Sequence, residues 1–224
     1  MKLQRGLTLI EMVIAISLLA IMISAIVFSF DGSKSRAQVL IAAMEEYTGA
    51  LERIKTDTSC YPKSLAALLD RTLSEGKDKS WCGADLSKQW NGPYVKSAPT
   101  KAATVGEGPV ILMSQLSPDL TLRVARQASK FSGTGGSDTW KWFVVADGVP
   151  REILTQALTV CNGDAGIGAT AGATAAPAFT GTRKCAKNGD GAGTVGYATT
   201  DLLLDAATDG TPGSFGLLFA ETRK

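Results

Sequence analysis

The chain has 224 residues, 45% of them hydrophobic, and a formal net charge of +2, so it is long enough for one sizeable domain. It contains no histidine, which excludes Ser-His-Asp and Cys-His catalysis and every zinc site with histidine ligands. No cluster of Lys and Arg exceeds two residues, so we expect no nucleic-acid partner.

An apolar segment near the N-terminus predicts a membrane span. Met12 to Phe30 is a run of 19 residues without a charge, and such a helix crosses a hydrocarbon core of about 30 Å. Lys2 and Arg5 precede the run, so the N-terminus is expected in the cytoplasm. An uncleaved anchor carrying a periplasmic domain is one interpretation. It leaves Glu11 unexplained, because a carboxylate near a bilayer centre costs at least ~2.5 kcal/mol.

The segment KLQRG followed by LTLIEMVIAISLLAIM resembles the class III signal of type IV pilins and their pseudopilin relatives. In that family a short basic leader ends in glycine, a hydrophobic residue begins the mature chain, and glutamate is its fifth residue. The resemblance implies cleavage between Gly6 and Leu7 by prepilin peptidase, N-methylation of Leu7, and a role for Glu11 in assembly.

The resemblance also implies where the protein acts and with what. The precursor is expected in the inner membrane and the mature chain in an extracellular filament on the bacterial surface. Expected partners are copies of the chain itself, minor pilins, prepilin peptidase and the pilus assembly machinery. Leu7 stands where phenylalanine is commoner, and a leader of residues 1–6 is shorter than in most type IVb pilins. The subclass stays open between type IVa, type IVb and pseudopilin.

Apolar residues at alternating spacings of four and three predict that the N-terminal helix continues beyond the membrane. They are Leu40, Met44, Tyr47, Leu51 and Ile54. We expect one helix of roughly 75 Å over about residues 7–57, with a membrane half at 7–30 and an amphipathic half at 31–58. The fold class is then α+β. The resemblance implies the type IV pilin fold, in which this helix packs against an antiparallel sheet with flanking helices in a head at residues 59–224.

Shorter patterns place the elements of the head. Pro62 is expected to start a short helix with Leu65, Leu68 and Leu69 facing inward, and a turn-rich W-x-G-P-Y-like element at 90–94 is similar to pilins. Alternating or β-rich runs predict strands at 120–125, 139–145 and 215–221. A helix is expected from Pro150, with one apolar face formed by Ile153, Leu154, Ala157 and Leu158.

Four cysteines behind a membrane segment predict two disulfides in an oxidising compartment. Their separations are 22, 79 and 24 residues, and three pairings are possible. Short loops close readily, which favours Cys60–Cys82 and Cys161–Cys185. Residues 162–196 are rich in Gly, Ala and Thr, so we expect a long surface loop held by Cys185 within a disulfide-bounded region of about 161–196. This loop either contacts other molecules or has no specific role.

The leading hypothesis is a structural subunit of a type IV pilus that serves adhesion, aggregation, motility or uptake. The alternatives are a type II secretion pseudopilin, a minor or tip pilin, and a membrane-anchored periplasmic enzyme. We expect no catalytic residues, no cofactor and no metal site, since Asp164, Asp190 and Asp201 lack the spacing of a calcium loop. Four tryptophans (Trp81, Trp90, Trp140 and Trp142) are either core packing or a stacking platform for sugars or bases.

Overall fold

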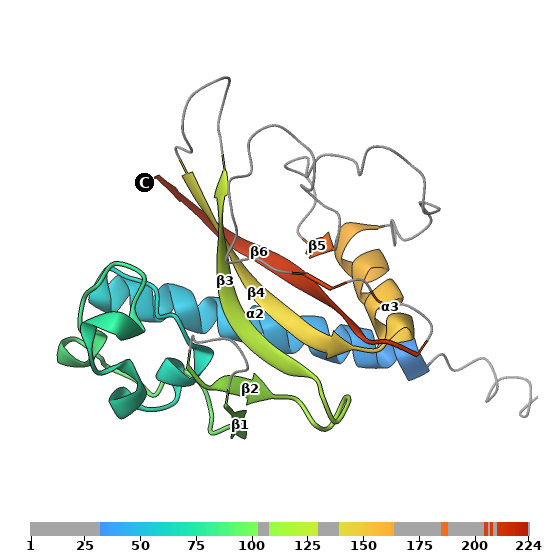
Figure 1. The fold of residues 1–224 in the computed structure, drawn as a ribbon, viewed down its shortest axis with the longest axis horizontal. Coiled ribbons are helices and arrows are strands. Elements are labelled where there is room, and N and C mark those ends of the chain that lie inside the picture. Colours follow the sequence, from blue (N-terminus) through green and yellow to red (C-terminus); the bar gives the residue numbers. More distant parts are fainter. Residues whose placement is uncertain are drawn as a thin grey trace, which may run out of the picture.

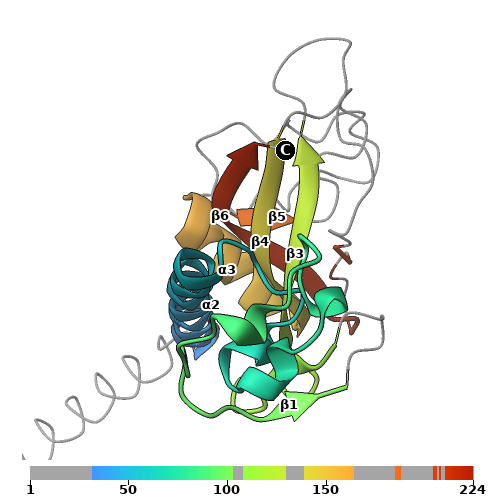
Figure 2. The ribbon, with the colours of Figure 1, turned by 90° about the vertical axis from the view of Figure 1, so that its left-hand side faces the viewer.

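The computed structural model describes residues 32–102, 108–129, 139–163, 185–187, 204–205, 207 and 210–223. Two helices, α2 (Gly32–Thr58) and α3 (Arg151–Asn162), lie against the same face of an antiparallel sheet (Figure 1). Figure 2 shows both helices on one side of the strands. The predicted α+β class is therefore confirmed for the described residues. None of the described helices is long and apolar enough to cross a membrane, and the predicted span lies outside these residues.

Six strands form the described sheet, in the spatial order β1-β2-β3-β4-β6-β5. They are β1 (Thr100–Lys101), β2 (Val110–Leu112), β3 (Thr121–Ser129), β4 (Thr139–Val149), β5 (Cys185–Lys187) and β6 (Gly213–Arg223). The strands predicted at 120–125, 139–145 and 215–221 are confirmed as parts of β3, β4 and β6. The sequence did not predict β1, β2 and β5, because two or three residues are too short to show alternation.

The amphipathic half of the predicted N-terminal helix is confirmed in α2. All five residues of its predicted apolar face are buried, and four of them have no exposed surface. This face packs against alternate residues of β4, of which Trp142, Val144 and Ala146 join the same core cluster. The residues between them, Phe143 and Val145, point to the opposite face and form a second, smaller cluster. The alternation in β4 thus separates the helix-facing core from the other side of the sheet.

The segment after α2 differs from its prediction. The helix expected from Pro62 is instead a 3₁₀ helix at Leu65–Leu68, where the Ser64 hydroxyl accepts a hydrogen bond from the Ala66 amide at 3.2 Å. Ser64 supplies the N-terminal cap that Pro62 lacks, and Pro62 pairs with Ser80 in an isolated β-bridge. Leu65 and Leu68 are buried as predicted, and Leu69 is half-buried. Further 3₁₀ helices follow at Arg71–Ser74, Lys77–Lys79 and Leu86–Lys88.

The predicted second helix is confirmed as α3. Pro150 is its N-cap rather than its first residue, and the four apolar residues predicted for one face are all buried. The expected loop at 162–196 is wrong for Cys185–Lys187, which form β5 beside β6. Cys185 and Ala186 are buried there. An edge strand can be this short because β6 supplies its hydrogen-bond partners, a contact that local composition does not reveal.

Candidate functional site

The residues to which the sequence assigns processing and assembly lie outside the described part of the chain. These are Gly6, Leu7 and Glu11. The described structure begins at Gly32, in the amphipathic half of the same predicted helix. It therefore shows the part of the site that follows the membrane segment, namely the outer surface of α2 and the contacts that fix α2 to the head.

The surface of α2 that faces away from the sheet is an exposed strip. Its members recur every three or four residues and all are exposed: Lys34, Gln38, Ala42, Glu45, Gly49, Glu52 and Thr56. The basic residue stands at the N-terminal end of the strip and the two acidic residues stand in its second half. Between them lie Ala42 and Gly49, and nothing lies within 4 Å of a Cβ built on Gly49. The strip thus has separated charges and room for the close approach of another helix.

Two tyrosine hydroxyls hold the other side of α2 to the following segment. The Tyr61 hydroxyl donates to the Glu52 carboxylate, and the Tyr94 hydroxyl donates to Asp57 Oδ2 at 2.6 Å. Burial raises the pKa of both tyrosines, and the hydrogen bonds to these carboxylates raise it further. Both hydroxyls therefore stay protonated at neutral pH and keep donating.

The first disulfide, Cys60–Cys82, closes the segment directly after α2. Next to it the Trp81 amide donates to the Tyr61 carbonyl at 3.1 Å, and the Lys63 amide donates to the Lys79 carbonyl at 2.9 Å. In the chain-entropy model, closing a loop of this length stabilises the fold by roughly 3 kcal/mol. The disulfide therefore fixes the C-terminal end of α2 to a rigid loop rather than to a mobile linker.

The second disulfide, Cys161–Cys185, joins the last turn of α3 to β5. The neighbouring Asn162 amide bonds the backbone of Cys185 in both directions. Its Nδ2 donates to the Cys185 carbonyl at 2.9 Å, and its Oδ1 accepts from the Cys185 amide at 3.0 Å. Both disulfides have the sequential pairing that the sequence favoured.

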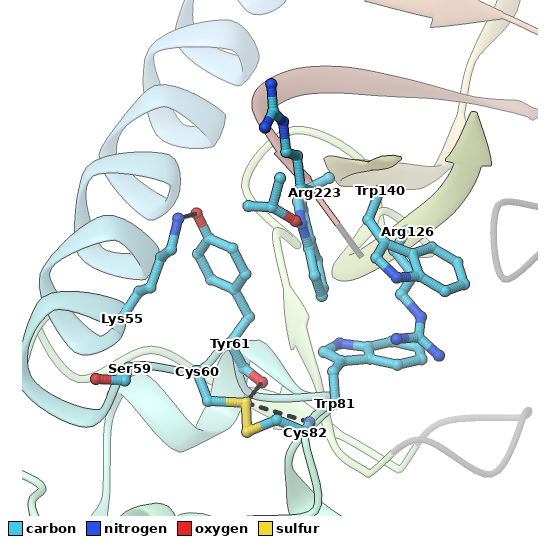
Figure 3. Close-up of a pocket in the computed structure, with 11 residues that line it drawn as sticks. Lys55, Ser59, Cys60, Tyr61, Trp81, Cys82, Arg126, Trp140 and Arg223 are labelled. Carbon is cyan, nitrogen blue, oxygen red and sulfur yellow. Dashed lines mark hydrogen bonds between the residues drawn. A yellow bond between two sulfur atoms is a disulfide. The ribbon is translucent and has the colours of Figure 1, made fainter. Parts of the chain in front are cut away.

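The four tryptophans fall into two groups. Trp90 is a packing residue: its ring meets Tyr94 edge-on at 5.7 Å between centroids, and its Nε1 donates to the Ala67 carbonyl at 2.9 Å. The other three gather at a cavity of about 340 Å³ beside the first disulfide, which Figure 3 shows in close-up. Arg126 also lines this cavity. The sequence gave no sign of the cluster, since its members lie far apart along the chain.

The described residues contain no group of three or more His, Cys, Asp or Glu side chains that could hold a metal ion. The three aspartates considered for calcium lie outside these residues. One buried donor in the described part, Trp81 Nε1, has no hydrogen-bond acceptor. Its ring stands edge-on to Trp142, with 6.0 Å between centroids and 72° between planes. An N–H directed at an aromatic face accounts for such a geometry.

Comparison with protein-family models places the N-terminal segment. Residues 1–27 match the prokaryotic N-terminal methylation motif. This segment is the class III prepilin signal of type IV pilins and pseudopilins, as the sequence resemblance indicated. The motif marks the precursor as inserted in the membrane and processed for assembly at the cell surface or in the periplasm. Neither the curated proteins nor the solved structures contain a match to the chain.

Proposed function

We propose that this protein is a structural subunit of a type IV pilus that polymerises through its N-terminal helix. The observation that carries the proposal is the methylation motif at residues 1–27, followed by a helix with one face in the head and one face exposed. An apolar helix leaving the membrane needs other apolar helices as neighbours. In a filament, copies of the same segment supply that environment, and the heads form its outer layer. The type IV pilin fold, with residues 7–58 as one helix, belongs to this proposal.

The exposed strip of α2 supports association between copies. Lys34 and Glu45 are eleven residues apart, three helical turns, so they lie on the same face and roughly 16 Å apart along the axis. Two parallel copies displaced by about this distance bring Lys34 of one level with Glu45 of the next. Opposite charges at that register attract, whereas an unstaggered pair sets like charges side by side. The charge pattern therefore favours a staggered, repeating contact, which is what a helical filament needs.

The proposal is tested by mass spectrometry of filaments sheared from the surface of cells that express the full chain. We expect this chain as an abundant component, beginning at N-methylated Leu7, because the motif directs cleavage after Gly6. Without reductant we expect two disulfide-linked peptide pairs, Cys60–Cys82 and Cys161–Cys185, and no alkylated thiol. Filaments that lack the chain, together with a loss of type II secretion when its gene is deleted, would instead identify a pseudopilin.

Charge exchange on α2 tests the staggered contact. Lys34→Glu places two carboxylates level with each other at every repeat, so we expect several-fold fewer sheared filaments. Each exposed pair contributes only about 0.2–1 kcal/mol, but a filament repeats the contact many times. The double variant Lys34→Glu/Glu45→Lys restores opposite charges and should restore the yield. Lys101→Glu, on exposed β1, is the matched control and should leave the yield unchanged. Equal yields from Lys34→Glu and the parent chain would refute the stagger.

A further inference from the structure

The cavity beside the first disulfide combines aromatic faces with positive charge. It lies where the C-terminal end of α2 and the disulfide loop meet the ends of β3, β4 and β6 (Figure 3). Its volume is about 340 Å³, and of its eleven lining residues four are aromatic, three are basic and none is acidic. A volume in this range is typical of a site for one small molecule or one unit of a polymer.

The floor of the cavity is rigid. Tyr61 and Trp142 are buried, with their ring centroids 4.5 Å apart. Trp142 Nε1 donates to Thr222 Oγ1 at 2.9 Å, and Tyr61 also meets the edge of Phe219 at 5.4 Å. The Cys60–Cys82 disulfide closes the adjoining wall. A ligand would therefore enter a preformed site, with little ordering of side chains to oppose binding.

One wall is a stack of Arg126 between two tryptophans. The Arg126 guanidinium lies 4.2 Å from the centroid of the Trp81 ring and 4.0 Å from that of Trp140. All three side chains are half-buried, so the stack is both fixed and open to the cavity. Figure 3 shows the guanidinium between the two indoles. A planar guanidinium held in this way can still donate hydrogen bonds from its edges.

The other two cations stand on the opposite side. Lys55 Nζ donates to the Tyr61 hydroxyl at 3.0 Å, and Glu52, which accepts from the same hydroxyl, partly balances its charge. Arg223 is exposed at the rim and makes no salt bridge with any described residue. The cavity is thus electropositive from two directions, with aromatic surface between them. A neutral ligand would leave this charge unused.

We propose that this cavity binds one unit of an acidic saccharide, such as a uronic acid. Its carboxylate would accept hydrogen bonds from Arg223 at the rim and from the Arg126 side, since guanidinium and carboxylate form strong charge-assisted pairs. Its C–H face would pack on the indole surface, where aromatic side chains bury much apolar area. A single-stranded nucleic acid needs a basic track along its backbone, whereas here the basic residues surround one cavity and the chain's net charge is only +2.

The test is a titration of the full-length chain in mild detergent, followed by tryptophan fluorescence, because three tryptophans line the cavity. The probes are trigalacturonate, its neutral counterpart maltotriose, and oligothymidylate. We expect saturable binding of trigalacturonate alone. Arg223→Gln should weaken it by about tenfold, the usual loss for a hydrogen bond between charged groups, and Arg223→Lys by less. Trp140→Leu should weaken it further, and Lys101→Gln is the control that should change nothing.

Several results would overturn the inference. They are equal binding of maltotriose, tighter binding of oligothymidylate, no saturable response to any probe, or trigalacturonate binding that Arg223→Gln leaves intact. Arg223 is exposed, so its variants test the site even if Trp140→Leu fails to fold. The measurement needs no filament, and its failure therefore leaves the proposed pilus function standing, just as absence of filaments would leave the cavity's ligand untouched.

Discussion

Replacing Glu11 by Ala is expected to abolish filaments while leaving the subunit intact. After cleavage at Gly6, the new amine of Leu7 is a cation four residues from Glu11, within the apolar segment. Leaving one charge of such a buried pair without its partner costs about 3–5 kcal/mol. Glu11 of a neighbouring copy can pair with this amine only when the two helices reach the correct axial register. The carboxylate would therefore select the register and recruit the next subunit.

The Glu11→Ala variant should insert, be cut after Gly6 and fold its head, yet give few or no sheared filaments. The matched comparison is Gly6→Val, in which a bulky side chain at the cleavage site blocks the peptidase, so the uncut precursor stays in the membrane. Immunoblots of membrane and sheared fractions, with N-terminal mass spectrometry, separate the two variants. Normal filament yield from cells with only Glu11→Ala would contradict the mechanism. A mature Leu7 terminus from Gly6→Val would contradict the cleavage site.

Replacing Gly148 by Ala is expected to be the most damaging single-methyl change in the described head. Gly148 has φ of +72°, and a Cβ at this position would collide with the backbone carbonyl of Asp119 in the turn before β3. A left-handed backbone alone costs a non-glycine residue about 1–2 kcal/mol. Because a backbone carbonyl cannot rotate away as a side chain would, the collision adds to this cost, and the total should exceed about 3 kcal/mol.

Gly83→Ala is the matched control. Gly83 has φ of +70°, almost the same as Gly148, but nothing lies within 4 Å of its added Cβ. The control should lose only the conformational term, about 1–2 kcal/mol, or a fall in Tm of roughly 2–4 °C per kcal/mol. Near-UV circular dichroism during heating of the full-length protein in detergent measures both. Equal Tm values for the two variants would show that the turn moves aside. If Gly148→Ala yields no folded protein, its rapid proteolysis in membranes beside a stable Gly83→Ala gives the same result.

Local physics made the long elements predictable. The spacing of Leu40, Met44 and Leu51 defines a helical face whatever lies opposite, and the same holds for Ile153 and Leu158 in α3. The three long strands carry enough residues to show alternation. The prepilin signal was readable because its residues act within one short segment, and the match at residues 1–27 confirms it. In each case the determining interactions join residues close together in the sequence.

Tertiary structure decided the remainder, because the interactions join distant segments. β5 exists only because β6 offers it a partner, and it comes from a segment whose composition predicts a loop. Pro62 pairs with Ser80 across the disulfide loop instead of starting a helix. The cavity forms only when the sheet brings Arg126 and Trp140 beside Trp81 and the end of α2. Sequence spacing carries no record of these contacts, since register and packing between elements are set by the whole core.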